Sequence, residues 1–283
     1  MRPQTAKTQR TAPSGTGRKG PSASRLPPRA TRAAPAPARH SQEELRSCFP
    51  TRPATLAVGL PCLPHGLWTL TIDDALANIK SMGFNAVRLP FSNECLAATS
   101  INGSLNYWAN RAYGIEGKTP LFLMDAVIAR AKANGLHIIL DRHRPSSAGQ
   151  SPLWYTSAYP ESKWIADWKM LAARYKNDPT LIGADLHNEP AGAATWSGAA
   201  ATDWQPAATR GGNAVLASNP NLLIIIEGIE NQGNGTSTWW RGGLADVKNK
   251  PVTLATPNRV VYSPACTAAC TAMAPPGRQV GPS

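Results

Sequence analysis

The sequence predicts an α/β protein built as a (β/α)8 barrel, or TIM barrel, of which only part is recognisable. Residues 65–264 alternate short β-rich runs with longer segments of helical periodicity. The β-rich runs are almost unbroken aliphatics, which is typical of parallel strands covered on both faces. Polar side chains follow several of these runs, at the strand ends where a barrel builds its active site.

Helices and strands can be assigned in order along this region. Apolar residues at helical spacing predict helices over residues 73–82, 119–134, 161–176 and 203–218. The second of these begins at Thr119-Pro120, favoured residues for a cap and a first turn, and ends at Gly135. Strands are expected over residues 84–90, 136–143, 181–189, 222–228 and 259–263. They correspond to strands 2–6 of a barrel, and strands 1, 7 and 8 are not recognisable.

A doubly wound sheet is the alternative architecture for such an alternation. A doubly wound nucleotide-binding protein should carry a glycine-rich turn after its first strand. None of the five expected strands is followed by GxGxxG or a P-loop. The strand ends instead carry Arg88, His143, Asn188-Glu189 and Glu227. This pattern favours the barrel.

The two ends of the chain differ from residues 64–264 in composition. Residues 1–63 are rich in Arg, Pro and Ala, and residues 1–60 hold eleven Lys/Arg against two acids. Residues 61–264 hold seventeen Lys/Arg against fifteen acids, so the net charge of +12 belongs mainly to the N-terminal segment. That segment is interpreted as a disordered basic arm or as out-of-frame translation. Residues 265–283 form an atypical tail, and no nucleic-acid partner is expected for the central region.

Cysteine usage and hydropathy limit the remaining classes of protein. Cys48, Cys62, Cys95, Cys266 and Cys270 form no recognisable framework, so the redox compartment stays undecided. Cys266 and Cys270 have no His or second Cys pair nearby, so no metal site is expected. No run approaches the roughly 18 apolar residues of a membrane span, and no membrane partner or cofactor is expected. The apolar core of a signal peptide is not readable either.

Glu189 is the main candidate for catalysis. Hydrolysis of a glycosidic bond needs a carboxylic acid that protonates the leaving oxygen and a second carboxylate that acts as nucleophile or base. Glu189 follows a buried strand and precedes Pro190, and Asn188 beside it could bond a sugar hydroxyl. Alternatively, Glu189 caps the next helix or pairs with an arginine. His143 could likewise only satisfy the strand-end backbone, and Arg88 could be a plain ion-pair partner.

Tryptophans complete the set of candidates. Trp68, Trp154 and Trp240 lie in expected loops rather than at helical spacing, together with Tyr155 and Trp239. Exposed aromatic rings stack on pyranose rings, although loop tryptophans also cover barrel ends. Trp164 and Trp168 are at helical spacing and are expected in the core.

Several motifs together resemble one enzyme family. They are HGLW, GFNAVRLPFS, IILDRHRP, GQSPLWYTS, LIGADLHNEP and GNAVLASNPNLLIIIEG. From residue 64 to residue 264 the chain closely resembles the bacterial cellulases of glycoside hydrolase family 5. The resemblance implies retaining hydrolysis of β-1,4-glucans and secretion, and a monomer is expected. It also implies that Glu189 is the acid/base and that Asn188 contacts the 2-hydroxyl. Arg88 and His143 would surround the carboxylates, and Trp68 and Trp240 would stack on sugars.

The resemblance ends abruptly at Pro264. The family would continue with a His-x-Tyr pair, a strand carrying the nucleophilic Glu and a strand with a stacking Trp. Glu227 and Glu230 are the only later acids near a strand end. Glu227 belongs to the strand next to that of Glu189, so we expect a buried structural acid there and no nucleophile in this chain. We therefore expect impaired hydrolysis of cellulose, mixed-linkage glucan or mannan, or alternatively a non-catalytic glucan-binding remnant.

Overall fold

The computed structural model describes residues 54–55, 58–60, 62–64, 66–101, 105–238 and 242–264, with the backbone alone at 54–55 and 58–60. The strands in chain order are β1 (Ala54–Thr55), β2 (Val58–Leu60), β3 (Leu63–Pro64), β4 (Ala86–Ser92), β5 (His137–Arg144), β6 (Leu181–Asp185), β7 (Leu223–Glu227) and β8 (Val260–Ser263). The helices are α2 (Ile72–Ser81), α3 (Asn93–Ala97), α4 (Tyr107–Asn110), α5 (Pro120–Ala133), α6 (Glu161–Arg174) and α7 (Trp204–Ser218), with short 3-10 turns at Arg111–Tyr113 and Ala245–Lys248.

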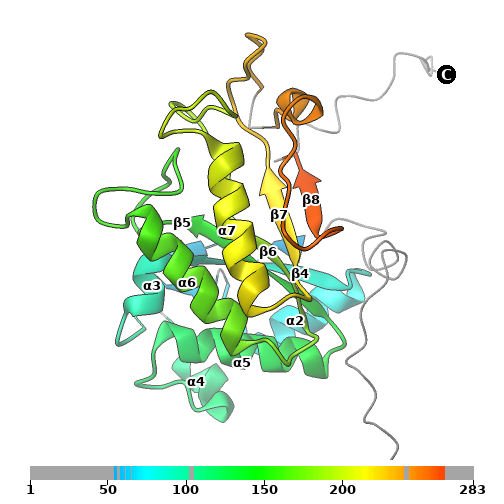
Figure 1. The fold of residues 1–283 in the computed structure, drawn as a ribbon. Helices are drawn as coiled ribbons and strands as arrows, with labels where there is room; N and C mark the ends of the chain where they lie inside the picture. The colour runs from blue at the N-terminus through cyan, green and yellow to red at the C-terminus, as the bar shows by residue number, and fades with distance from the viewer. Residues whose placement is uncertain are drawn as a thin grey trace, which may run out of the picture. The chain divides into compact units, whose positions relative to one another are not determined.

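Six strands form one parallel sheet in the order β1-β4-β5-β6-β7-β8. From β4 onward the strand order in space follows the order along the chain, as expected for a barrel wall built from successive strand–helix units. β2 and β3 form a separate antiparallel pair. Figure 1 shows α6 and α7 side by side, running along the same face of the sheet near β6 and β7.

The expected helices are confirmed, with ends that differ by a few residues. Thr71 caps α2 by accepting from the Asp74 backbone N–H, and Thr119 caps α5 by accepting from Phe122. Pro120 occupies the first turn of α5, where its missing N–H costs nothing. Gly135, with φ of +62°, follows α5 and turns the chain into β5.

The five expected strands are confirmed, with two corrections. A first strand, which the sequence did not reveal, is present as β1 and lies parallel to β4. Its two residues are too few to show any alternation within an Arg/Pro/Ala-rich stretch. The strand expected over 181–189 ends at Asp185, because the chain then leaves the sheet and reaches Glu189 in a left-handed conformation.

The two faces of the sheet bury different sets of apolar residues. The larger core lies between sheet and helices and includes Trp164, Trp168 and Trp204, all at most 1% exposed. A Cβ at Gly211 of α7 would lie 2.4 Å from the ring of Trp164, so only glycine lets α6 and α7 approach this closely. A smaller cluster is formed by Ile139, Ile182, Leu223 and Ile225. Gly183 of β6 makes room for Ile225 there, since its Cβ would lie 2.6 Å from Ile225 Cδ1.

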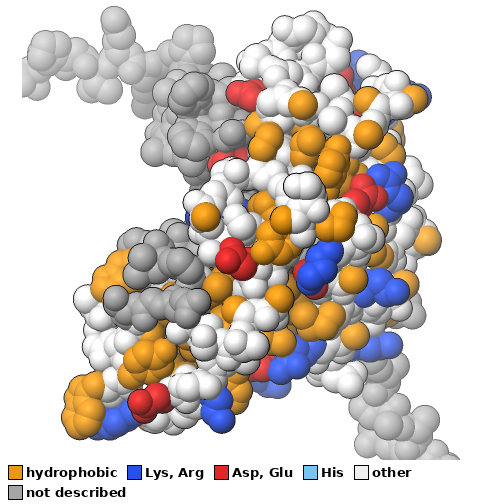
Figure 2. All heavy atoms as spheres, turned by 90° about the vertical axis from the view of Figure 1, so that its left-hand side faces the viewer, with side chains coloured by type: hydrophobic (Ala, Val, Ile, Leu, Met, Phe, Trp, Pro, Cys, Tyr) orange, Lys and Arg blue, Asp and Glu red, His pale blue; other side chains and the backbone are white. Residues whose placement is uncertain are grey.

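Charged side chains on the described surface are mixed in sign. Figure 2 shows red and blue side chains interspersed between apolar ones on one face. This agrees with the near balance of Lys/Arg and Asp/Glu within residues 61–264.

Candidate active site

Arg88 on β4 is the centre of a group of buried carboxylates. Its Nη1 lies 2.8 Å from Asp141 Oδ2, and its Nη2 lies 2.7 Å from both Asp185 Oδ2 and Glu227 Oε1. The three acids come from the successive parallel strands β5, β6 and β7, where Asp185 and Glu227 end their strands and Asp141 lies in the second half of β5. Asp141 and Asp185 are direct partners in the β5–β6 register, so their side chains share one face. We call Arg88 and these three acids the Arg88 cluster.

The acids of the Arg88 cluster are more deeply buried than the arginine. The side chains of Asp141, Asp185 and Glu227 are 0%, 4% and 5% exposed, against 15% for Arg88. Burial raises the pKa of Asp185 to about 6, and the attraction of Arg88 only partly offsets this. Burial, followed by the neighbouring Asp185, raises the pKa of Glu227 well above its usual value. One guanidinium among three carboxyls therefore leaves the cluster with a preference for holding a proton.

His143 joins the same cluster through Asp141. Its Nδ1 lies 2.7 Å from Asp141 Oδ2, which also binds Arg88. A carboxylate only accepts, so His143 Nδ1 carries the proton and the ring orientation is fixed. The His143 side chain is 22% exposed, whereas Asp141 is fully buried. The imidazole is thus the part of this pair that faces outward.

The segment Asn188-Glu189-Pro190 leaves the sheet beside the Arg88 cluster. Arg88 Nη2 donates to Asn188 Oδ1 at 3.0 Å, which orients the amide. Glu189 has a φ of +55°, which costs a non-glycine residue roughly 1–2 kcal/mol. The Glu189 backbone N–H donates to Glu227 Oε2 at 2.8 Å, and Gln150 Nε2 donates to the Asn188 carbonyl at 2.9 Å. Glu189 is half-buried, whereas Asn188 is 5% exposed.

Arg142, the residue after Asp141 on β5, is a second arginine near the site and is fully buried. Arg142 donates to Asn93 Oδ1 at 2.8 Å, to His187 Nδ1 at 2.8 Å and to the Trp154 carbonyl at 2.9 Å. Burial lowers the pKa of Arg142 to about 9. Burial also lowers the pKa of His187, helped by the charge of Arg142, so His187 accepts as a neutral imidazole. We call Arg142 and these three partners the Arg142 cluster.

The structure brings four of the six candidate residues together. Arg88, His143 and Asn188 are joined by direct or shared hydrogen bonds, and the backbone of Glu189 follows Asn188. Trp68 lies in the turn before α2 and packs partly against the larger core, so its role in stacking stays a prediction. Trp240 lies outside the described residues.

Asp141, Asp185 and His187 were not predicted as site residues from the sequence, and Glu227 was predicted only as a buried structural acid. Asp141 and Asp185 each interrupt an aliphatic run, which is a signal in the sequence, but only the register of β5 and β6 shows that they share one face. Glu227 was expected as a buried structural acid, and its 4% exposure and bond to Arg88 agree with this. Trp154 was expected in a loop, and its side chain is fully buried against Trp204.

Within the described part of the chain, no group of three or more His, Cys, Asp or Glu is arranged to hold a metal ion. None of its helices is long and apolar enough to cross a bilayer.

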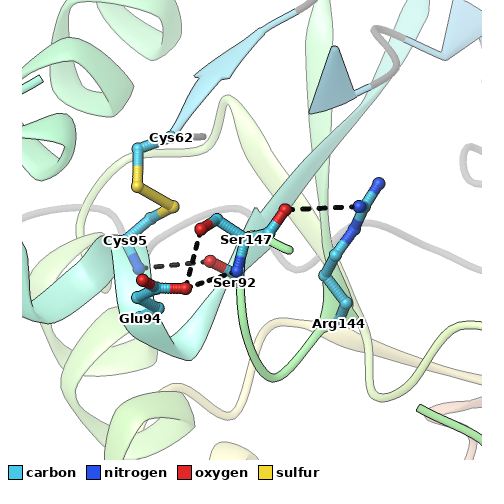
Figure 3. Close-up of a disulfide and its surroundings, with 6 residues drawn as sticks. All are labelled: Cys62, Ser92, Glu94, Cys95, Arg144 and Ser147. Carbon is cyan, nitrogen blue, oxygen red and sulfur yellow. Dashed lines mark hydrogen bonds between the residues drawn. A yellow bond between two sulfur atoms is a disulfide. The ribbon is translucent and has the colours of Figure 1, made fainter. Parts of the chain in front are cut away.

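A disulfide joins the N-terminal segment to the region that follows β4. Cys62 is bonded to Cys95 of α3 (Figure 3). Beside it, Ser92 caps α3 by accepting from the Cys95 N–H at 3.1 Å, and Glu94 accepts from the backbone and hydroxyl of Ser147. Both bonds to Ser147 lower the pKa of Glu94. Helix α3, which follows β4, and the segment after β5 are thereby joined.

The sequence that forms the described sheet matches a known family. A family model described as cellulase (glycosyl hydrolase family 5) matches residues 54–264. The chain belongs to glycosyl hydrolase family 5. The match begins before residue 64, where the resemblance was expected to start, and includes β1. The six parallel strands are thus part of the (β/α)8 barrel of this family.

Relatives within family 5 extend beyond the matched region. An endoglucanase from Paenibacillus polymyxa is 55% identical over 203 residues, which are 71% of this chain and 51% of the relative. The major extracellular endoglucanase of Xanthomonas campestris pv. campestris is 43% identical over 204 residues, which are 71% of this chain and 42% of the relative. The chain spans about half the length of these curated relatives.

Solved structures of family 5 members share the described architecture. The catalytic domain of the X. campestris enzyme superposes with a TM-score of 0.67 at 41% identity, over 71% of this chain and 59% of that domain. A variant endocellulase from Pyrococcus horikoshii in complex with cellotetraose superposes with a TM-score of 0.69 at 35% identity, over 75% of this chain and 62% of that chain.

Proposed function

We propose that this chain carries the acid/base half of a retaining endo-β-1,4-glucanase site, with Glu189 as general acid/base. The observation that carries the proposal is the position of Glu189. Glu189 is half-buried and follows the end of β6. The preceding Asn188 accepts from Arg88, and Arg88 and His143 both bind Asp141. A carboxyl at such a strand end can protonate the oxygen of a leaving sugar.

Asn188 supports a role in substrate binding. Its Oδ1 accepts from Arg88, so its amide nitrogen is the group that remains to donate to a sugar hydroxyl. Relatives named endoglucanase, and a relative in complex with cellotetraose, support a β-1,4-linked glucan as the substrate class.

We further propose that hydrolysis by these 283 residues is weak. The Asp141, Asp185 and Glu227 carboxyls are all bonded to Arg88, and Glu227 also accepts the Glu189 N–H, so none is placed to attack a sugar. Outside the described residues the sequence holds only two further acids, Glu43 and Glu44. A retaining mechanism requires a second carboxylate about 5–5.5 Å from the acid/base.

The proposed setting is extracellular, with the protein acting as a monomer and without nucleic acid. The Cys62–Cys95 disulfide supports an oxidising compartment. One relative is named an extracellular endoglucanase. The near balance of charges in residues 61–264 offers no extended basic surface for phosphates.

Two measurements on the purified chain test the proposal: sugar release from carboxymethyl cellulose and depletion onto insoluble cellulose. We expect binding, with turnover at least about 100-fold below that of the P. polymyxa relative, the size of effect expected when a catalytic group is missing. Turnover equal to that of the relative would contradict the missing second carboxylate. Absence of binding would contradict the glucan as ligand.

A chimera tests the role of Glu189 itself. Residues 54–264 would be joined to the C-terminal remainder of the X. campestris catalytic domain, which supplies the rest of the barrel. We expect hydrolysis in this chimera, a loss of about 100-fold or more in Glu189→Gln, and no change in the control Glu230→Gln. Glu230 is also half-buried near a strand end, but its carboxylate accepts only from the Gly192 N–H among the described contacts. Equal activity of the two variants would reject Glu189 as acid/base.

A further inference from the structure

The carboxyl of Glu227 contacts both halves of the candidate site. Its Oε1 accepts from Arg88 Nη2 at 2.7 Å, and its Oε2 accepts from the Glu189 backbone N–H at 2.8 Å. Glu227 is 4% exposed and ends β7, so its own position is fixed by the sheet. One buried side chain therefore links the arginine of the cluster to the main chain of the acid/base residue.

The contacted peptide group belongs to a backbone that needs support. Glu189 is in the left-handed region, where L side chains are disfavoured, and Pro190 after it has no N–H to donate. The backbone N–H groups of the residues that flank Glu189-Pro190 also donate hydrogen bonds. Asn188 N–H donates to the Arg142 carbonyl at 3.2 Å, and Ala191 N–H donates to the Pro152 carbonyl at 2.9 Å. The Glu227 bond completes this set at the central residue.

The same carboxyl is also coupled to Asn188. Arg88 Nη2, which donates to Glu227, donates to Asn188 Oδ1 as well. A displacement of Glu227 would therefore move the Asn188 amide and the Glu189 backbone together. In the proposed function, Asn188 binds the substrate and Glu189 is the acid/base.

We propose that Glu227 is a positioning residue that holds the Asn188-Glu189 backbone in its left-handed turn and so sets where the acid/base side chain leaves the strand end. Glu227 touches no substrate in this role and acts through the peptide N–H of Glu189. The assignment of what is positioned rests on the proposed function, whereas the contact itself does not.

Glu227→Gln removes one of the two acceptors, because a glutamine amide offers a single oxygen. Asp185→Asn is the matched control. Asp185 is equally buried, is bonded to Arg88 and also contacts the Glu227 carboxyl, but none of its contacts in the described structure involves the Glu189 N–H. If Glu227 acts only by keeping the Arg88 cluster intact, both variants should change the Glu189 backbone. If Glu227 positions Glu189 directly, only Glu227→Gln should change it.

Amide hydrogen exchange and NMR of the full chain provide the readout. In the parent protein we expect the Glu189 amide to be protected. In Glu227→Gln its exchange should be about tenfold faster, the change expected for loss of one hydrogen bond, and the Glu189 amide and side-chain carboxyl resonances should shift. Asp185→Asn should leave both signals close to the parent values. Equal changes in the two variants would overturn the proposal.

If Glu227→Gln does not fold, the parent protein still decides. A Glu189 amide that exchanges as fast as an unprotected loop amide would overturn the proposal. In the family 5 chimera, Glu227→Gln should lower kcat more than it raises KM, with Asp185→Asn as the comparison. If the exchange results hold but Glu189→Gln leaves the chimera active, the positioning is correct and the proposed function is wrong.

Discussion

The Arg88 and Arg142 clusters place two buried arginines in neighbouring strands with opposite electrostatic surroundings. Arg88 meets three carboxylates, and although burial opposes it, these raise its pKa above the ordinary value. Arg142 meets a side-chain amide, a neutral imidazole and a carbonyl, and burial lowers its pKa to about 9. Arg142 is fully buried, whereas Arg88 keeps 15% of its side chain exposed.

The difference separates an arginine that lies among acids at the candidate site from an arginine that joins neutral groups of separate chain segments. Charge is concentrated at the strand ends, where a polar substrate is proposed to bind, and the three acids there are stable only beside a cation. The Arg142 cluster uses its donors to join α3, β5 and the segments that contain Trp154 and His187. These hydrogen bonds stabilise the segments that Arg142 joins, and none of them involves a carboxylate.

Removing Arg88 should have the largest effect on stability. Arg88→Met leaves three carboxyls buried together without a cation, and breaking a buried ion pair in this way costs about 3–5 kcal/mol. We expect a lower free energy of unfolding by about that amount, measured by urea denaturation at pH 7. Part of the loss should be recovered at pH 5, because burial raises the pKa of Asp185 and of Glu227 and so favours their uncharged forms. A loss under about 1 kcal/mol would show that Arg88 does not compensate the acids.

Asp185 should give the next largest effect, through pH. Its folded pKa of about 6 lies above the value of about 3.9 in an unfolded chain, so its contribution is fully present below pH 4. That contribution is lost as the pH rises through 6. Relative to Asp185→Asn, the parent protein should lose roughly 3 kcal/mol of unfolding free energy between pH 4 and pH 7.

The quantity to measure is the difference in unfolding free energy between the parent protein and Asp185→Asn at each pH. His187, whose pKa is lowered, contributes in the opposite direction over part of the same range and cancels in the comparison. Parallel curves for the two proteins would contradict the raised pKa of Asp185.

Removing Arg142 should have a smaller effect than removing Arg88. Arg142→Met leaves neutral acceptors without donors and no uncompensated charge, which costs on the order of 2 kcal/mol. Arg174→Met serves as the exposed control, because Arg174 pairs with Asp125 while 42% exposed, and such pairs contribute under about 1 kcal/mol. Urea denaturation of the three variants tests the order Arg88, Arg142, Arg174. An Arg142 variant less stable than the Arg88 variant would reverse the comparison.

The sequence by itself determined the alternation of strands and helices and therefore the class of fold. Aliphatic runs such as 222–228 and the Thr119-Pro120 start of α5 depend on local propensity and burial, which are written in consecutive residues. The same holds for Asn188, Glu189, His143 and Arg88 as candidates, because they stand where apolar runs end.

The tertiary structure decided which of these residues act together. Asp141 and Asp185 are separated by more than forty positions in the chain and meet only because β5 and β6 pair in register. The left-handed turn at Glu189 and its bond to Glu227 have no signal in the dipeptide Asn188-Glu189. The short strand β1 depends on pairing with β4 and not on its own two residues. Contacts of this kind depend on distances between strands, and a single sequence specifies those distances only through the complete fold.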